Sequence, residues 1–594
     1  MGVRPSRIRS VVLQRSQHCF SSFGAFTTEE MQRRLIECVP NISEGRDRAK
    51  IDAIAAVVET VEGVRLLDID PGKATNRTVI TFVGEPEQVI EAAFRLIKKA
   101  QELIDMRQHK GEHPRFGATD VCPLVPISGI TMDEVVSFAH KLAERVGNEL
   151  KIPVYCYEFA AKEEKRRNLA NNRSGEYEGL PKKLKDPQWE PDFGPSEFNG
   201  SVAKSGAVAI GARNFLVAYN VNLNTTSTRR ANAIAFDIRE AGRVVREGDP
   251  LTGKPILDEK GEPKKIPGKL KAVKGIGWYI EEYGIAQLSL NLTDITVTPV
   301  HVAFDEAVKS AAERGIRVTG SELVGLIPKK ALLDAADHYL TRQERSLGIP
   351  EKEKIKIAVK SLGLDDLAPF DPHKKVIEYM LEDPAQERLV RLDLRSFSEE
   401  TAKESPAPGG GSVAAYVGAL GAALGTMVAN LSAHKRGWDD RWEEFSKWAV
   451  IGEKFRNELL FLVDEDTRSY ERIIQAFSLG KATPEEQAAR KKAITEATKG
   501  AIGAPLRTME VCVESMGLMK AMAENGLPAS VSDAGVGALC ARTGALAAYL
   551  NVHINCAELD DEIFKKEAIE KVECLKLEVE QLEREVMAIT LSKV

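Results

Sequence analysis

The segment richest in reactive side chains is HKGEHPRFGATDVCPLVP, at residues 109–126. Its first twelve residues contain two histidines, a lysine, an arginine and two acids, interrupted by glycine and proline. Loops of this kind often carry functional groups, and histidine exchanges protons near neutral pH because its ordinary pKa is about 6.5. The segment therefore predicts an acid–base site, with a structural loop held by salt bridges as the alternative.

Metal chemistry finds little support in the sequence. The HxxxH spacing of His109 and His113 is one zinc pattern, but the HExxH motif is absent, and Gly111 and Pro114 oppose a regular helix. The eight cysteines are scattered and form no CxxC pair. We therefore expect no metal, and reduced thiols in a cytosolic protein.

Three further clusters gather acids, amides and glycines in the first half of the chain. They are DIDPGKATNRT at 68–78, ECVPNISEG at 37–45 and DFGPSEFNG at 192–200. Side chains of these types at strand ends are typical of binding sites in sheet proteins. Each cluster alone is equally typical of an ordinary turn.

The second half has its own candidate residues. PAPGGGSVAA, at 406–415, is a glycine-rich turn that opens a helix, where free N–H groups bind anions. It lacks the GK[ST] ending of a P-loop, so a plain helix entry is the alternative. LVDEDTRSYERI, at 462–473, places Asp464 and Asp466 among apolar residues, and Asp533 and Asn551 follow later. Acids inside a helical bundle are costly to bury and usually functional, whereas a solvated helix face is the alternative.

Hydrophobic periodicity divides the chain into halves of different fold class. Strands are expected at 64–70, 77–84, 208–223 and 285–294, and helices at 85–104, 228–242 and 299–315. Two such blocks in series predict two α/β sandwich subdomains. A polar stretch at 246–269 predicts an exposed loop or hairpin arm, which is either an inert insertion or a substrate flap. After about 390, strand signals vanish, and helical runs predict an all-helical bundle.

The boundaries that follow are a leader at 1–30, subdomains at 31–214 and 215–380, a linker at 381–390 and a helical domain at 391–594. The uncharged stretch Ser412–Leu431 has the length of a membrane span, but its Ala and Gly content favours a closely packed buried helix. The net charge of -6 gives no basic surface for nucleic acid.

The first 27 residues contain four arginines, several serines and no acid. This composition is typical of an organelle import signal, and Gly2 and Ser6 also fit a myristoylation pattern. A third interpretation is a non-native leader with translation starting at Met31. We expect a cytoplasmic protein and leave the leader out of the fold.

Ordered motifs along residues 31–380 resemble the formimidoyltransferases. They include ECVPNISEG, LLDIDPGKATNRTVITFVG, LIDMRQHKGEHPRFGATDVCPLVP, YEGLPKKLKDPQWEPDFGPS, GARNFLVAYNVNL and KGIGWYIEE. The resemblance implies two ferredoxin-like subdomains in an α+β half. It also implies that His113 is the catalytic acid–base, with Asp70, His109, Lys110 and Arg115 as supporting candidates. The folate-binding segment that it implies is Gly194, Pro195, Ser196, Glu197, Phe198, Asn199, Gly200, Ser201, Val202 and Ala203. This segment keeps DFGPS but carries FNGSVA where animal members have a Trp-containing stretch.

Residues 391–594 resemble the cyclodeaminases through PAPGGGSVAA, MVANLS, VDEDTRSY and AYLNVHIN. The resemblance implies that Asp466 is the active-site acid, with Asp533 as a further candidate. An anion or folate loop would comprise Gly409, Gly410, Gly411 and Ser412. SAHKRGWDD, at 432–440, departs from relatives that more often carry Gly before the lysine.

Together the two resemblances imply a bifunctional enzyme of histidine degradation. It would transfer the formimidoyl group of N-formimidoyl-L-glutamate to tetrahydrofolate, which is a polyglutamylated co-substrate, and cyclise the product to 5,10-methenyltetrahydrofolate with release of ammonia. Relatives form homo-oligomers, so we expect one here. The alternatives are a cyclohydrolase in the helical half, formyl transfer in the first half, and a folate-binding scaffold with inactive sites.

Overall fold

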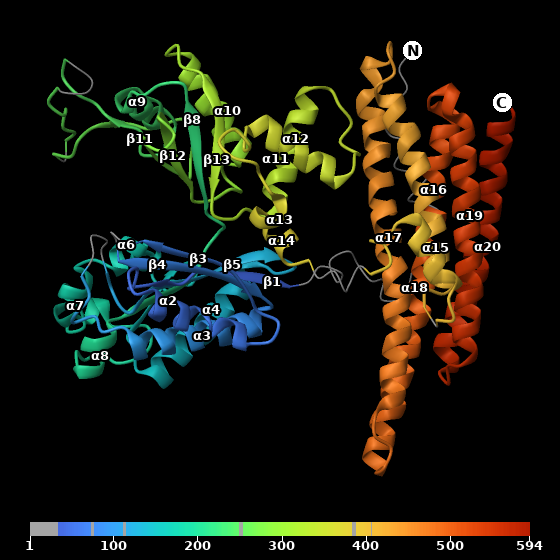
Figure 1. Ribbon diagram of the computed structural model, residues 1–594, viewed down its shortest axis with the longest axis horizontal. Coiled ribbons are helices and arrows are strands. Elements are labelled where there is room, and N and C mark those ends of the chain that lie inside the picture. Colours follow the sequence, from blue (N-terminus) through green and yellow to red (C-terminus); the bar gives the residue numbers. More distant parts are fainter. Residues whose placement is uncertain are drawn as a thin grey trace. The chain divides into compact units, whose positions relative to one another are not determined.

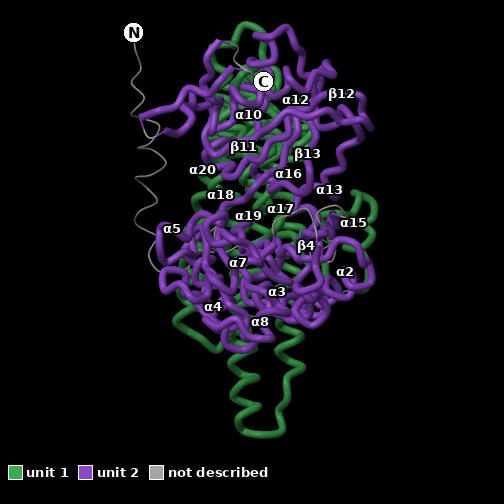
Figure 2. The backbone as a smooth tube through the Cα atoms, turned by 90° about the vertical axis from the view of Figure 1, so that its left-hand side faces the viewer, with its two compact units in different colours: residues 1–21, 332–361, 382–594 green, residues 22–331, 362–381 purple. Residues whose placement is uncertain are grey.

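A computed structural model describes residues 34–72, 76–110, 115–248, 253–259, 261–382, 388–405 and 407–594. Its described residues fall into two compact units (Figures 1 and 2). One contains residues 34–331 and 362–381, and the other contains residues 332–361 and 382–594. The leader at 1–30 and the candidate His113 lie outside the described residues.

The first sheet is built around a βαββαβ unit. A strand broken at Val39–Pro40 into β1 (Leu35–Cys38) and β2 (Asn41–Ile42) is followed by α2 (Arg48–Ala55), β3 (Arg65–Gly72), β4 (Arg77–Gly84), α3 (Pro86–Leu103) and β5 (Thr119–Ser128). β3 and β1 both pair with β4, and β1 and β2 pair with β5, all antiparallel. This order is that of the ferredoxin-like fold.

Two parallel strands extend this sheet beyond β5. After α4 (Met132–Leu150), β6 (Val154–Glu158) and β7 (Val208–Ala212) join in the order β5-β7-β6. A core of buried residues from α3, α4 and the strands, including Ile80, Phe82 and Leu142, lies on one side of the sheet. Between β6 and β7 run the short helices α5 (Glu164–Arg167), α6 (Leu169–Asn172), α7 (Glu176–Lys183) and α8 (Gly200–Ser205).

The second sheet repeats the βαββαβ pattern. β8 (Val217–Leu223), α9 (Thr228–Ile238), β11 (Val273–Ile280), β12 (Ile285–Leu292), α10 (Val300–Ala312) and β13 (Val318–Val324) form an antiparallel sheet in the order β11-β12-β8-β13. Two ferredoxin-like subdomains are therefore present, as expected from the resemblance. The described part of the polar arm pairs β9 (Arg243–Val244) with β10 (Lys265–Ile266), so it is a hairpin.

Two expectations for this half were wrong. The apolar run 208–223 is two strands, because Arg213 and Asn214 interrupt it and its ends belong to different sheets. Periodicity could not detect the break because both strands are buried. The reactive segment 109–126 was expected as a loop, but its second half lies in the strand β5, Thr119–Ser128.

The helical unit is a bundle of five long helices preceded by α15 (Leu394–Ala402). They are α16 (Gly410–Ala433), α17 (Trp442–Ser478), α18 (Pro484–Asn525), α19 (Val531–Ala557) and α20 (Glu562–Leu591). The tip formed by the end of α17 and the start of α18 extends beyond the other helices (Figures 1 and 2). Among the described helices, α16 alone is long and apolar enough to cross a membrane, and 61% of its most apolar window is buried in the bundle.

Helix α18 continues through a proline. The runs 483–502 and 505–526 form the single helix α18, with Pro505 inside it. A proline cannot donate a hydrogen bond to the carbonyl four residues earlier, which here is that of Ala501. The Asn555 amide of α19 donates to this carbonyl instead, at 2.7 Å. The helix therefore continues because a neighbouring side chain satisfies the group that the proline leaves free.

Residues 332–361 pack with the bundle. They include most of α11 (Lys329–Arg342) and α12 (Glu351–Leu362). The loop between these helices binds α16 and α17: the Ser446 hydroxyl accepts from the Leu347 N–H at 2.9 Å, and Asn430 donates to the Gly348 carbonyl at 2.7 Å. A Cβ on Gly348 would lie 2.1 Å from the Ala449 carbonyl carbon, so only glycine fits there. This grouping differs from the boundary expected at 380, which stays a prediction.

Candidate functional sites

The described flanks of the His113 loop are held by Asn76, which lies just before β4. The Asn76 amide accepts from the Gly45 N–H and donates to the Lys110 carbonyl, both at 2.9 Å. The Asn76 carbonyl lies 2.8 Å from His109 Nε2. Clusters 37–45, 68–78 and 109–126, which the sequence singled out separately, therefore meet at one point.

His109 is fixed and neutral. Its side chain is buried, and Arg115 Nη1 lies 3.4 Å from its Nδ1. Because an arginine only donates, Nδ1 must accept, and Nε2–H then donates to the Asn76 carbonyl. Burial lowers the pKa of His109, and the Arg115 charge acts in the same direction. With both ring nitrogens engaged, His109 is suited to positioning the loop rather than to proton transfer.

Both flanks of the loop are attached to the predicted folate segment. The Ala118 N–H donates to the Ser205 carbonyl at 2.7 Å, and the Met106 N–H donates to the Lys204 carbonyl at 2.9 Å. Both acceptors lie at the end of α8, whose first four residues belong to the segment 194–203. Asn199 caps this helix by accepting from the Ser201 and Val202 N–H groups. The structure thus brings the folate segment to the base of the His113 loop.

The remaining transferase candidates differ in their surroundings. Arg115 forms an ion pair with Glu178, and its guanidinium lies 5.3 Å from the centre of the Tyr177 ring. The Lys110 side chain is exposed. Asp70 is an exposed residue of β3, two positions before Gly72, which pairs with Arg77 of β4. Burial raises the pKa of the neighbouring Asp68, and the charge of Asp70 adds to the effect.

A buried group that the sequence did not reveal lies beside this site. Arg77, Asp120 and Arg173 come from β4, β5 and the turn after α6, and Arg173 Nη2 lies 2.9 Å from Asp120 Oδ2. Burial raises the pKa of Asp120 to about 6, against the lowering effect of the two arginines. No local motif reveals this group, because Asp120 is 43 residues from Arg77 and 53 residues from Arg173 in the sequence.

The cyclodeaminase candidates form a compact group at the start of α16. The Ser412 hydroxyl donates to the Val463 carbonyl at 2.8 Å and lies 3.1 Å from Asp466 Oδ2. The Ser412 backbone N–H also hydrogen-bonds to the Asp466 carboxylate. A Cβ on Gly411 would lie 2.1 Å from Asp466 Oδ1, so the carboxylate requires glycine there. Asn551 of α19 lies on the other side, 3.4 Å from the position of a Cβ on Gly410.

The environment of Asp466 favours its protonated form. Burial raises the pKa of Asp466, and the two hydrogen bonds from Ser412 only partly offset this effect. A carboxyl with a raised pKa beside the free N–H groups of a helix start can hold or deliver a proton.

The two other acids have different surroundings. Asp533 lies in the first turn of α19, eighteen residues from Asn551, which corresponds to about 27 Å along a helix. The structure therefore does not bring Asp533 to Asp466. Asp464 is 5% exposed, and its carboxylate accepts from the Leu389 and Val390 N–H groups at 2.8 and 3.2 Å. It attaches the chain entering the bundle to α17, so a solvated helix face was the wrong alternative here.

Among the described residues, no group of three or more His, Cys, Asp or Glu side chains is arranged to hold a metal ion. Metal-free chemistry stays a prediction.

Comparisons with known proteins match both halves of the chain. Family models match in chain order: "Formiminotransferase domain, N-terminal subdomain" over residues 35–213, "Formiminotransferase domain" over 218–382 and "Formiminotransferase-cyclodeaminase" over 393–574. The formimidoyltransferase-cyclodeaminase of Rattus norvegicus is 43% identical over 543 residues, which cover 91% of this chain and 96% of that protein. The chain belongs to the formimidoyltransferase-cyclodeaminase family.

Each half of this family member also resembles a separate protein. The glutamate formimidoyltransferase of Streptococcus pyogenes serotype M1 is 41% identical over 52% of this chain and 93% of its own length. The methenyltetrahydrofolate cyclohydrolase of Methylorubrum extorquens is 36% identical over 34% of this chain and 97% of its own length.

Proposed function

We propose that this family member carries out both reactions of a formimidoyltransferase-cyclodeaminase in sequence. The first half transfers the formimidoyl group of N-formimidoyl-L-glutamate to N5 of tetrahydrofolate and releases glutamate. The helical half then cyclises 5-formimidoyltetrahydrofolate to 5,10-methenyltetrahydrofolate and releases ammonia. The fusion, matched by one relative across 91% of the chain, supports a shared pathway.

In the transferase half, we assign the proton transfers to His113. N5 attacks the formimidoyl carbon and loses a proton, and the glutamate nitrogen gains a proton as its bond to that carbon breaks. One histidine can do both in turn. The fixed, neutral His109 supports this assignment because both of its ring nitrogens are already engaged.

In the helical half, the assignment depends mainly on the contact of Asp466 with the start of α16. N10 attacks the formimidoyl carbon, its proton leaves, and the imino nitrogen departs as ammonia after protonation. A carboxyl whose pKa is raised by burial can supply that proton. The N–H groups of Gly410 and Gly411 are placed to bind an anionic part of the folate.

Cyclohydrolase activity is the second candidate function for the helical half. The similarity of this half to the Methylorubrum extorquens cyclohydrolase favours this candidate. That reaction consumes water and releases no ammonia. The test is to supply formimidoylglutamate and tetrahydrofolate together and to measure methenyltetrahydrofolate by absorbance and ammonia separately. Equal amounts of both products support the proposal, whereas methenyltetrahydrofolate formed only from formyltetrahydrofolate would support the cyclohydrolase.

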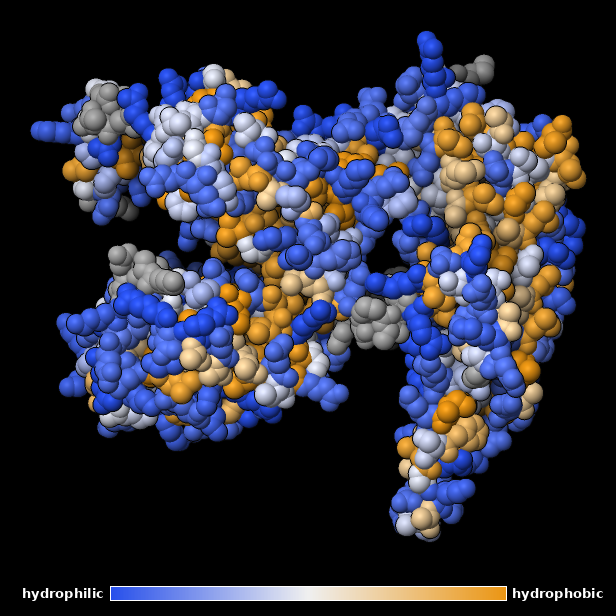
Figure 3. All heavy atoms as spheres, viewed as in Figure 1, coloured by the Kyte–Doolittle hydropathy of each residue, from blue (hydrophilic) through white to orange (hydrophobic). Residues whose placement is uncertain are grey.

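We also propose that the chain forms a homo-oligomer through the helical unit. Exposed apolar residues gather on its visible face (Figure 3). Leu420, Met427 and Leu431 of α16 and Val536 and Leu539 of α19 are between 37% and 47% exposed, which is unusual for adjacent helices of a monomer. A cytoplasmic location is proposed from the seven described cysteines, all of which are free. Polyglutamylated tetrahydrofolate is the proposed co-substrate.

A further inference from the structure

Arg77 is a mostly buried arginine for which the described part of the chain supplies no ion-pair partner. It opens β4, and its Nε is inaccessible to solvent and makes no hydrogen bond. Its guanidinium forms no ion pair with any residue that the structure describes. Burial lowers the pKa of Arg77, and the Arg173 charge acts in the same direction, whereas the Asp120 charge opposes it.

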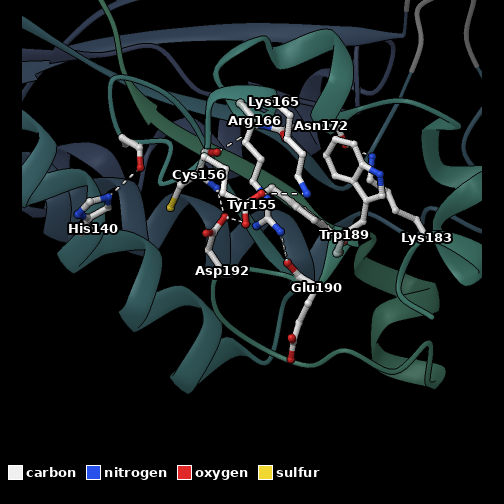
Figure 4. A network of polar contacts seen from close by, with 12 residues as sticks. His140, Tyr155, Cys156, Lys165, Arg166, Asn172, Lys183, Trp189, Glu190 and Asp192 are labelled. Atoms are coloured by element: carbon white, nitrogen blue, oxygen red, sulfur yellow. Dashed lines mark hydrogen bonds and ion pairs between the residues drawn. The ribbon is translucent and has the colours of Figure 1, made fainter. Parts of the chain in front are cut away.

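The neighbouring Arg173 is held in place by a buried scaffold (Figure 4). Asn172 donates to the Arg166 carbonyl at 2.8 Å, and Arg166 Nη1 pairs with Asp192 at 2.9 Å. The Lys183 ammonium donates to the Asn171 and Asn172 carbonyls, at 3.1 and 2.6 Å, and lies 4.2 Å from the centre of the Trp189 ring. The turn that carries Arg173 is therefore rigid.

The charge of Arg77 is not matched within this group. Asp120, which is 2% exposed, forms its ion pair with Arg173, and no ion pair joins it to Arg77. The other acid that acts on Asp120 is Glu176, whose side chain is exposed. A buried excess of positive charge is costly unless an anion completes it, and a guanidinium fork matches a carboxylate.

We infer that Arg77, with Arg173 beside it, binds a carboxylate of formimidoylglutamate. This inference rests on the proposed transferase function. Tetrahydrofolate also carries carboxylates, on its glutamyl tail, but the pterin and aminobenzoyl groups separate that tail from N5. Arg77 directly follows Asn76, which holds Lys110 and His109 at the start of the His113 loop. A carboxylate there belongs to the substrate whose formimidoyl carbon must lie at that loop.

The test replaces Arg77 by glutamine and by lysine in the full chain, with Arg107→Gln as the control. Arg107 lies near the same loop but is exposed and paired with Asp105. The Arg77→Gln variant should raise the KM for formimidoylglutamate roughly 10- to 100-fold, because a charge-assisted hydrogen bond is lost. The KM for tetrahydrofolate should stay within about twofold. Arg77→Lys should be intermediate, since it keeps the charge but loses the fork.

Substrate analogues identify the carboxylate. N-formimidoyl-4-aminobutyrate lacks the α-carboxylate, and N-formimidoylnorvaline lacks the γ-carboxylate. One of them should be a poor substrate of the unmodified enzyme and should lose no further activity in the Arg77→Gln variant. Two analogues that both lose as much in the variant as formimidoylglutamate does would overturn the inference.

Two further arms separate the alternatives. If the defect falls on the KM for tetrahydrofolate and disappears with tetrahydropteroate, Arg77 binds the folate tail and the inference is wrong. If the unmodified chain forms no 5-formimidoyltetrahydrofolate at all, the proposed function itself fails, and the inference fails with it. If Arg77→Gln does not fold, the KM of the Arg77→Lys variant decides.

Discussion

Asp464 and Asp466 lie two positions apart on α17, and the same substitution should affect them in opposite ways. Asp466→Asn keeps the size of the side chain and an acceptor for Ser412, but it cannot exchange a proton. Ammonia release should fall by about two orders of magnitude or more. The variant should still form 5-formimidoyltetrahydrofolate, which should accumulate because transfer occurs in the other half.

Its stability should change little or increase. The folded chain binds the proton of Asp466 more tightly than the unfolded chain does, because burial raises its pKa. The charged carboxylate therefore destabilises the fold at pH values above the folded pKa. This deficit disappears as the pH falls below the ordinary value for aspartate. An uncharged asparagine avoids the deficit at neutral pH.

Asp464→Asn should show the reverse. The carboxylate accepts from two backbone N–H groups, at 2.8 and 3.2 Å, whereas asparagine offers one oxygen and places an NH2 group against the second donor. The loss should be about 2 to 3 kcal/mol. With a denaturant slope of about 2 to 3 kcal/mol per molar urea, the unfolding midpoint should fall by roughly 1 M.

Tryptophan fluorescence suits the measurement, because three of the five tryptophans, Trp438, Trp442 and Trp448, lie at or near the start of α17. Glu465→Gln, which removes ion pairs with Arg468 and Arg472 on the same helix, is the control and should change neither property much. Normal ammonia release by the Asp466 variant would refute the assignment. Equal loss of stability in both aspartate variants would refute the distinction between an anchor and a proton donor.

Three other predictions follow from the two sites. His113→Ala should lower transferase turnover by roughly 100- to 10,000-fold without affecting cyclisation of supplied 5-formimidoyltetrahydrofolate, and His109→Ala should do less; near-normal transfer by the His113 variant would contradict its role. A fragment ending near residue 385 should transfer the formimidoyl group but release no ammonia, although its residues 332–361 lose their packing against the bundle. An inactive fragment beside an active full chain would place the domain boundary elsewhere. Light scattering should show a homo-oligomer that Leu420→Glu with Leu431→Glu weakens, and a stable, active monomer of the unmodified chain would oppose it.

Much of the fold was predictable because it depends on local patterns. The strand 77–84 and the helix 85–104 were placed to within a residue of β4 and α3, since turn residues and regular periodicity mark their ends. The run 208–223 was not resolved, because two strands buried in different sheets give the same apolar signal as one long strand.

The site residues were likewise predictable only where they belong to local sequence motifs. Asp466 and Gly409–Ser412 were separate motifs in the sequence, and the structure brings them into contact. The group of Arg77, Asp120 and Arg173 carries no local signal, because its members meet only when β4, β5 and the turn after α6 come together. The anchoring role of Asp464 was equally hidden, since its partners are backbone groups 74 and 75 residues away.

The hydrogen bond between Asn555 and the Ala501 carbonyl makes two distant positions interdependent. Loss of Asn555 alone would leave that carbonyl unsatisfied and should cost about 1 to 3 kcal/mol. If Pro505 were alanine, a backbone N–H would satisfy the carbonyl, and Asn555 would become dispensable. The order of substitutions therefore matters in evolution. Asn555 can be replaced without this loss only after Pro505 has been replaced, and a proline can arise at 505 without it only where Asn555 is already present.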